Sequence, residues 1–237
     1  MSGLWAGGVI EKPVSIPVPN ALLNGDLAIP ESACGLILFA HGSGSSRKSP
    51  RNRAVAAALQ AGPFATLLLD LLTPAEESVD AITAQHRFDI LLLAKRLMVA
   101  IDWAATDPAT AELRIGLFGA STGAAAALVA AAERPNAVKA IVSRGGRPDL
   151  AMPVLNRVRA PTLLIVGGKD LSVIDLNDLA LDHLQCIKRL SIVPRATHLF
   201  DEPGTLERVA ELAGEWFEQY VAAGALQAEP PMPSETG

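Results

Sequence analysis

The sequence predicts an α/β fold in which a mostly parallel sheet is covered by helices on both faces. Short apolar runs alternate with longer segments of helical character along most of the chain, which is typical of a parallel sheet. Several apolar runs are continuous, as expected of strands that are buried on both sides. A chain of 237 residues, 50% of them hydrophobic, can bury a large core, and we predict one domain at residues 1–226.

The strands are predicted from these runs and from the turn residues that bound them. Residues 14–18 and 25–29 suggest a peripheral antiparallel hairpin, although the prolines within or beside them count against strands. Further strands are predicted at residues 35–40, 64–69, 113–118, 138–142, 162–166 and 188–193.

Helices are expected between these strands. They are predicted at residues 51–61, 87–105, 124–132, 176–184 and 203–223, and the first ends at the stop signal Gly62-Pro63. Residues 227–237 are rich in Pro, Glu, Ser and Gly, so we predict a flexible C-terminal tail there.

Composition excludes several classes of function. The formal charge of −5, without a long basic block, makes nucleic acid an unexpected partner. No apolar stretch approaches the roughly 20 residues of a membrane span, and residues 1–12 lack a leader pattern. With two distant cysteines, the chain resembles a reduced cytoplasmic protein. The four histidines and two cysteines form no ligand-spaced cluster, so neither a metal nor a cofactor is predicted. An exposed edge strand would allow a homodimer, but the sequence leaves the oligomeric state open.

The most informative motif is Gly-Ala-Ser-Thr-Gly at residues 119–123. It lies between a predicted strand and an alanine-rich helix, which is the context of a nucleophile elbow. Glycines are needed on both sides of Ser121 because neighbouring chain must approach the sharp turn closely. The alternative is that Ser121 only caps the helix, as serine often does.

Asp170 and His198 could form a catalytic triad together with Ser121. Each follows a predicted strand, at the edge where open α/β sheets keep their active sites. His198 would take the proton from Ser121, and Asp170 would fix the histidine tautomer and stabilise the imidazolium. Asp170 could instead form a turn or cap a helix, and Asp175 is a nearby alternative.

The segment His41-Gly42-Ser43-Gly44-Ser45-Ser46 follows the strand predicted at residues 35–40. Its glycines let the backbone N–H of Ser43 point at a developing oxyanion, while the N–H of Thr122 would be the second donor. The alternatives are a flexible turn or a phosphate-binding loop, and the GxxxxGK[ST] pattern of the latter is missing from the sequence. We expect His41 to be a structural residue that forms hydrogen bonds at the strand end.

With these residues, the chain resembles the α/β-hydrolase superfamily and, within it, the dienelactone-hydrolase-like group. The likeness rests on residues 41–47, Ser49-Pro50-Arg51-Asn52-Arg53, the 119–123 elbow, Gly167-Gly168-Lys169-Asp170 and 196–200. It implies the α/β-hydrolase fold and a Ser121, Asp170, His198 triad. Typical members carry a cysteine nucleophile, so carboxylic esters become the expected substrates and lactones remain an alternative. The group also includes proteins in which such a domain is joined to a phosphoribosyltransferase.

The substrate is less well defined than the chemistry. The connection between residues 142 and 162 is too short for a large helical lid, which favours short, soluble esters. Arg47, Arg144 and Arg147 follow strand ends and could hold an anionic substrate group. Alternatively, these arginines tie loops together by pairing with acids such as Asp70, Asp149 or Glu76. Two other functions also stay open: acyl transfer to an alcohol or peroxide through the same triad, and a non-catalytic interaction domain.

Overall fold

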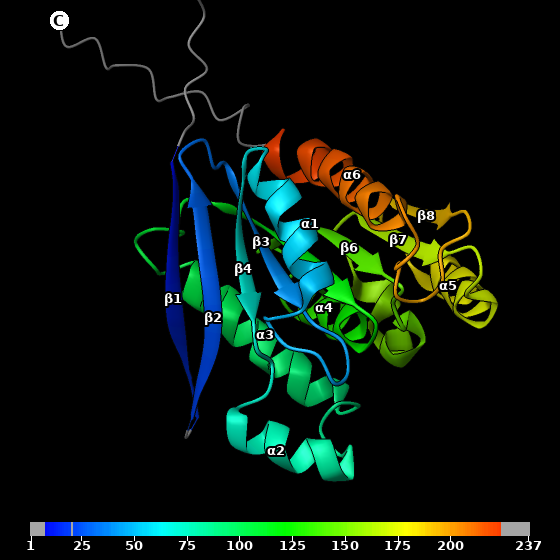
Figure 1. Cartoon of the computed structure of the whole chain (residues 1–237), viewed down its shortest axis with the longest axis horizontal. Coiled ribbons are helices and arrows are strands. Elements are labelled where there is room, and N and C mark those ends of the chain that lie inside the picture. Colours follow the sequence, from blue (N-terminus) through cyan, green and yellow to red (C-terminus); the bar gives the residue numbers. More distant parts are fainter. Residues whose placement is uncertain (1–7, 20, 224–237) are drawn as a thin grey trace, which may run out of the picture.

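A computed structural model describes residues 8–19 and 21–223, and it confirms the mostly parallel sheet. The sheet of this described part has eight strands in the order β1-β2-β4-β3-β5-β6-β7-β8 (Figure 1). Strands β1 and β2 are antiparallel to their neighbours at one edge, and all other pairs are parallel. The predicted tail at residues 227–237 lies outside the described residues.

The hairpin at the edge is longer than the sequence suggested. Because Pro13 and Pro17 lie in the edge strand β1, their missing N–H groups cost few ladder bonds. The strands are β1 (Val9–Val18), β2 (Ala21–Pro30), β3 (Gly35–Ala40), β4 (Phe64–Leu69), β5 (Arg114–Ala120), β6 (Val138–Arg144), β7 (Thr162–Gly167) and β8 (Lys188–Val193).

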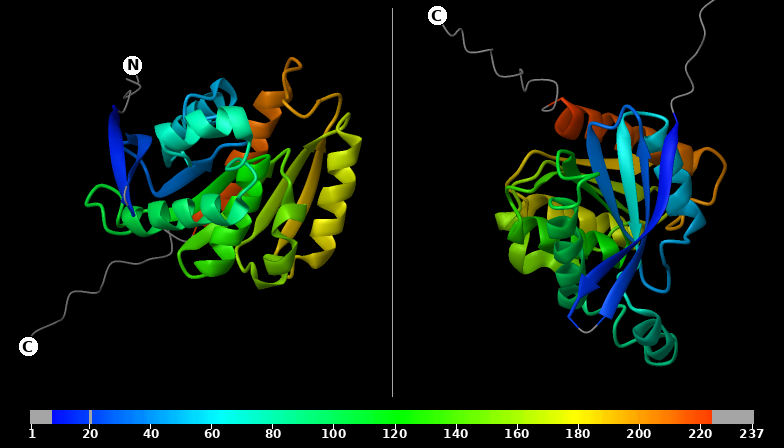
Figure 2. Two further views of the ribbon diagram at one scale, coloured as in Figure 1. Left: turned by 90° about the horizontal axis from the view of Figure 1, so that it is seen from below. Right: turned by 90° about the vertical axis from the view of Figure 1, so that its left-hand side faces the viewer.

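Helices cover both faces of the sheet (Figure 2). On one face lie α3 (Ile90–Ala104), α4 (Thr122–Glu133) and α5 (Leu171–His183), and on the other α1 (Pro50–Gln60) and α6 (Thr205–Phe217). A short π-helical segment, η2 (Glu218–Ala222), continues α6. Two apolar clusters result, one on each face, and because β3 to β8 are parallel their C-terminal ends lie at the same edge of the sheet.

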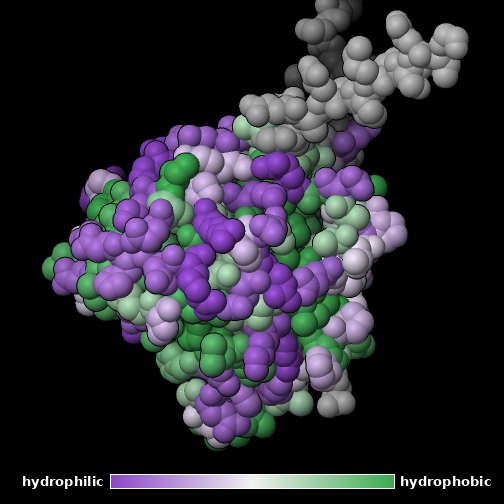
Figure 3. Space-filling view, turned by 180° about the vertical axis from the view of Figure 1, so that it is seen from behind, coloured by the Kyte–Doolittle hydropathy of each residue, from purple (hydrophilic) through white to green (hydrophobic). Residues whose placement is uncertain are grey.

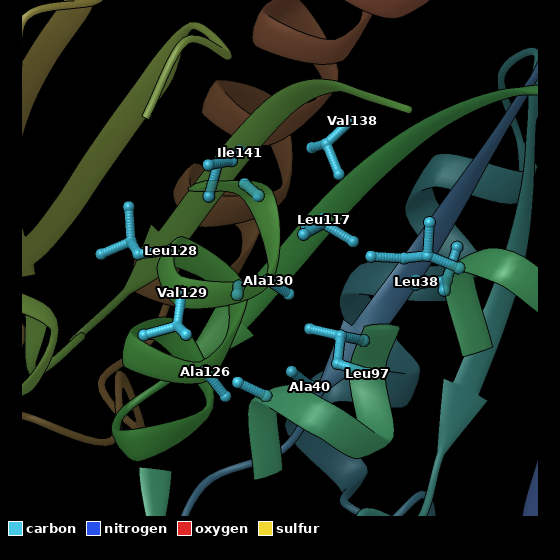
Figure 4. Close-up of a cluster of buried hydrophobic side chains, with 14 of the residues drawn as sticks. Leu38, Ala40, Leu97, Leu117, Ala126, Leu128, Val129, Ala130, Val138 and Ile141 are labelled. Atoms are coloured by element: carbon cyan, nitrogen blue, oxygen red, sulfur yellow. The ribbon is translucent and has the colours of Figure 1, made fainter. Parts of the chain in front are cut away.

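Helix α4 is packed deepest of these. Nearly all its residues are buried, because its alanines leave no bulk that would hold it away from the sheet. Figure 4 shows Ala126 and Ala130 of α4 in the same cluster as Leu97 of α3 and Leu38 and Leu117 of the sheet. This packing fixes the start of α4, which follows Ser121 directly.

Two segments were not predicted from the sequence. Helix α2 (Pro74–Thr83) begins with a capping box, in which Thr73 and Glu76 each accept a hydrogen bond from the other's backbone. That Thr-x-x-Glu pattern is a signal that could have been found. The other is a 3-10 segment, η1 (Pro148–Arg157), between β6 and β7. Helix α5 also begins five residues earlier than expected, at Leu171 instead of residue 176.

Polar and apolar side chains are interspersed over the rear face of the molecule (Figure 3). Within residues 8–19 and 21–223, no helix combines the length and apolar character that crossing a membrane would require.

Candidate active site

The turn between β5 and α4 holds Ser121 in a strained conformation. Its φ of 50° and ψ of −121° lie in a region that residues with a side chain rarely adopt. A Cβ atom on Gly119 would lie 2.4 Å from Cα of Ala124, and one on Gly123 would lie 2.2 Å from the carbonyl oxygen of Ala40. These contacts are with main-chain atoms, which cannot turn aside. Both glycines of the elbow are therefore sterically required, as predicted.

Ser121 and Asp170 both occupy N-cap positions, the first of α4 and the second of α5. Neither side chain makes a capping hydrogen bond to its helix. The carboxylate of Asp170 instead bonds to the ring of His198, with 2.6 Å between Oδ2 and Nδ1. Because an ionised carboxylate only accepts, Nδ1 donates and Nε2 is left as the basic nitrogen. The histidine thus bonds to Asp170 and not to the alternative, Asp175.

Two loops are held together so that Asp170 and His198 can meet. The N–H of Lys169 donates to the carbonyl oxygen of Ala196 at 2.9 Å. Gly167 permits this approach, since a Cβ there would lie 2.5 Å from the same oxygen. The sequence showed Gly167 and Gly168 at the end of β7, but the reason for Gly167 lies in the neighbouring loop.

The end of β6 connects Ser121 with His198. The N–H of Ser121 donates to the carbonyl oxygen of Arg144, and the N–H of Arg147 donates to the carbonyl oxygen of Ser121, both at 3.2 Å. Between them, Gly145 has a φ of 52°, and a Cβ there would lie 3.5 Å from Nδ1 of His198. Sequence reasoning missed Gly145, although two glycines directly after a strand could have drawn attention to it. The three predicted residues thus follow the ends of β5, β7 and β8, and the end of β6 lies between those of β5 and β7.

The loop after β3 reaches the elbow. A Cβ on Gly42 would lie 3.0 Å from Cβ of Ser121, so this loop passes directly beside the candidate nucleophile. Thr122 begins α4, and its N–H therefore has no acceptor within the helix. Ser43 and Thr122 line the same small cavity of about 30 Å³. The two predicted oxyanion donors thus belong to residues that share one cavity.

His41 has the structural role that we expected. Its Nε2 accepts from the N–H of Leu71 at 3.0 Å, and its Nδ1 donates to the carbonyl oxygen of Gly42 at 2.9 Å. With one nitrogen accepting and the other donating, the ring is held in one neutral tautomer. Burial lowers the pKa of His41, which also favours the neutral form. His41 therefore anchors the loop and has no nitrogen left to act as a base.

The three candidate arginines differ in their partners. Arg47 forms ion pairs with Asp70 and Asp26, and its backbone N–H also donates to Asp70 at 2.7 Å. Arg147 makes two bonds of 2.8 Å to Asp149. For these two the structure favours the alternative in which arginines tie loops together.

Arg144 is different, because it is only 8% exposed and its Nε and Nη1 have no hydrogen-bond partner among the described residues. No three His, Cys, Asp or Glu side chains in that part of the chain are grouped as metal ligands.

The sheet order, the elbow and the placement of the polar residues at the strand ends define an α/β hydrolase. The chain belongs to the dienelactone hydrolase family, whose model matches residues 56–222. A dienelactone hydrolase from Anabaena variabilis is 60% identical, with a TM-score of 0.88 over 90% of this chain and 99% of that one. Est1E from Butyrivibrio proteoclasticus is 18% identical, with a TM-score of 0.75 over 89% of this chain and 99% of its own, and shows likeness of fold alone.

Two Mycobacterium tuberculosis proteins, from different strains, are each 57% identical over 204 residues. They carry the provisional name phosphoribosyl transferase. The match covers 86% of this chain but 44% of each relative, so the chain spans less than half of their length.

Proposed function

We propose that the protein is a serine hydrolase that cleaves carboxylic esters through an acyl-serine intermediate. The observation that carries the proposal is the 2.6 Å bond between Asp170 and His198, together with a strained Ser121 whose hydroxyl is not used as a helix cap. A carboxylate that orients a histidine, with an uncommitted serine at the same edge of the sheet, supports the arrangement that activates a hydroxyl group.

In the proposed reaction, Oγ of Ser121 attacks the ester carbonyl carbon while Nε2 of His198 takes its proton. The backbone N–H groups of Ser43 and Thr122 stabilise the oxyanion of the tetrahedral intermediate. The ester C–O bond then breaks, and His198 gives the proton to the departing alcohol. Water attacks the acyl-serine in the same way, releasing the acid and free Ser121. Asp170 stays ionised throughout and stabilises the imidazolium.

The state of the cysteines supports serine as the nucleophile. Burial raises the pKa of both Cys34 and Cys186, so neither thiol is activated. Cys34 lies directly before β3, at the end of that strand opposite to the elbow. Cys186 lies just before β8. Position 121 is therefore the place where the chemistry of this chain departs from that of typical cysteine-dependent members.

The expected substrates are short, soluble esters, with lactones as an alternative. The short connection between β6 and β7 contains only the 3-10 segment η1, which supports a site without a large lid. Acyl transfer to an alcohol or peroxide would use the same acyl-serine and stays a second candidate. Because the chain corresponds to 44% of its mycobacterial relatives, we do not extend phosphoribosyl transfer to it.

A fluorophosphonate probe tests the nucleophile. We expect one covalent label on the wild-type protein, and none on Ser121→Ala. Ser191→Ala, on the edge strand β8, is the matched control and should label like the wild type. Equal labelling of wild type and Ser121→Ala would show that another residue reacts, and a wild type that takes no label would refute the catalytic proposal.

A panel of p-nitrophenyl esters of increasing chain length, run beside lactones, defines the substrate. We expect kcat/KM to fall as the acyl chain lengthens. Adding a competing alcohol separates hydrolysis from transfer, because a transferase would form mostly the new ester while a hydrolase would form mostly the free acid.

A further inference from the structure

Helix α1 forms a ridge between two grooves on one face of the molecule. The first, called the α6 groove, lies between α1 and α6 and has a volume of about 540 Å³. The second, called the hairpin groove, lies between α1 and the β1–β2 hairpin and has a volume of about 490 Å³. Figure 1 shows α1 between the hairpin and α6. The order across this face is therefore hairpin groove, α1, α6 groove.

The α6 groove is apolar inside and acidic along one side. Leu59, Phe64 and Leu206 are among the residues that line it. It is also lined by all four glutamates of α6 and η2, namely Glu207, Glu211, Glu215 and Glu218. These two segments contain one cation, Arg208, which bonds to Glu211 at 2.9 Å. Three negative charges thus remain in excess along this side of the groove.

The hairpin groove has the opposite balance. Three cations and two acids line it: Lys12, Lys48, Arg53, Glu11 and Asp26. Nζ of Lys48 and Nη2 of Arg53 each lie 3.9 Å from Oδ2 of Asp26, which is too far for a hydrogen bond. Both side chains are more than half exposed. These two cations can therefore bind carboxylates from outside the chain.

The ridge between the grooves carries no charge along most of its length. Arg53 is the last charged residue of α1, and the exposed residues that follow it in the helix are Ala54, Ala57 and Ala58. A helix that faces water normally presents polar or charged side chains on its outer side. Alanine side chains are small, so the backbone of another helix can approach them closely. The outer side of α1 is thus suited to protein contact.

A second copy of the chain has the complementary surface. When two copies face each other about a twofold axis that runs along α1, the order of features is reversed in the partner. Each α6 then lies opposite the hairpin groove of the other copy, so acids meet bases at both ends of the interface. An axis across α1 would place α6 against α6, where like charges repel. The charges therefore favour the axis along α1.

We propose that α1, α6 and the two grooves form the interface of a homodimer. In this dimer, the glutamates of α6 pair with the cations of the partner's hairpin groove, and the alanines of α1 lie at the centre. The interface is isologous, so each acid–base contact occurs twice. The inference does not depend on the proposed ester hydrolysis, because assembly is measured without a substrate.

Sedimentation equilibrium of the full chain measures the assembly. We expect a species of twice the mass of the chain, and a Kd that rises when NaCl is raised from about 50 mM to about 500 mM, since salt screens the exposed charges. A protein that stays monomeric at about 1 mM would overturn the proposal, because that concentration detects even a weak interface. A dimer that forms only after deletion of residues 224–237 would also overturn it, since the chain's own segment would then be the occupant.

Charge exchange tests which surfaces meet. Glu211→Lys/Glu215→Lys and Lys48→Glu/Arg53→Glu should each raise the Kd of self-association roughly 10-fold or more, because each puts like charges opposite one another. An equimolar mixture of the two variants should form a 1:1 heterodimer, since both contacts are then restored. If the mixture stays monomeric, or if the separate variants dimerise like the wild type, the arrangement is wrong.

Two further variants are controls for charge and for position. Asp178→Lys/Asp182→Lys makes the same change of charge on α5, which lies on the opposite face of the sheet, and should dimerise like the wild type. An equal loss in this variant would assign the effect to net charge and overturn the interface. Ala58→Arg adds bulk to the ridge, and the exposed position should accept it without loss of fold, as checked by circular dichroism and Tm. A folded Ala58→Arg protein that still dimerises would place the interface elsewhere.

Discussion

Replacing Ser121 by glycine should make the protein more stable while removing its nucleophile. Ser121 has a φ of 50° and a ψ of −121°, and a side chain in such a conformation costs about 1–3 kcal/mol. Glycine adopts it without strain but gains freedom in the unfolded chain, which offsets roughly 0.5–1 kcal/mol. The net gain is about 0.5–2 kcal/mol, and a domain of this size melts roughly 2–4 °C higher per kcal/mol. We therefore expect Ser121→Gly to raise the Tm by roughly 1–8 °C.

Differential scanning calorimetry checks this with two controls. Ser121→Ala also lacks the hydroxyl but keeps Cβ and its strain, so its Tm should lie below that of Ser121→Gly. Ser191→Gly places the same substitution in β8, where φ is not positive, and should lower the Tm. A Ser121→Gly protein that melts at or below Ser121→Ala would refute the reasoning, because it would show that the elbow stores no strain at this residue.

Four further outcomes follow from single residues. Gly123→Ala should lose about 1–3 kcal/mol or more in urea unfolding, since its Cβ would lie 2.2 Å from a main-chain oxygen; full stability would mean that the turn is not tight. Gly214→Ala, inside α6, should gain about 1 kcal/mol, because its Cβ would make only an ordinary contact of 3.9 Å; a loss would contradict this. Asp170→Asn should lower kcat on p-nitrophenyl acetate by roughly 10⁴, and an activity within a few-fold of wild type would remove Asp170 from the mechanism. Burial lowers the pKa of His41 below 6.5 in the folded state. Below pH 6.5 the unfolded chain therefore binds a proton that the folded chain does not, and the free energy of unfolding falls by up to about 1.4 kcal/mol per pH unit. His41→Gln should show a smaller loss between pH 7.5 and 5.5, and an equal loss would assign the effect to other groups.

The fold could be predicted because its central strands are buried on both faces of the sheet. The strands β3, β4 and β7 are buried at every residue, so each appears in the sequence as a continuous apolar run that predicts a strand. The order of the strands could not be obtained this way, because it depends on contacts between residues far apart in the chain. Helix α2 was missed for another reason: eight of its ten residues are exposed, so it has no continuous apolar face, and only its cap marks it.

The candidate site could be predicted where the need for a particular residue type arises from contacts close by in the sequence. The glycines around Ser121 are required by contacts within a few residues and with β3. The motif itself therefore predicts the tight turn. Gly145 could not be assigned, because its reason is the ring of His198, more than fifty residues away in the chain. Residues whose constraint comes from another loop look ordinary in the sequence.

The arginines show the same division. Arg147 finds its acid two residues along, at Asp149, and this pairing is visible in the sequence. Arg47 finds Asp70 across 23 residues, but β3 and β4 are parallel neighbours, so the residues that follow them end side by side. Both guanidinium groups therefore have an aspartate partner, Asp149 for Arg147 and Asp70 for Arg47.

Among the described residues, the same topology gives Nε and Nη1 of Arg144 no hydrogen-bond partner. Strand β6 lies between β5 and β7, and the residues paired with Arg144 across the sheet are Ala120 and Ile165, neither of which can accept a hydrogen bond through its side chain. An acid could reach Arg144 only from the loops above, where Asp201 already bonds to Arg51. The strand pairing that places Ser121 beside the end of β6 thus supplies no side-chain acceptor for the cation there.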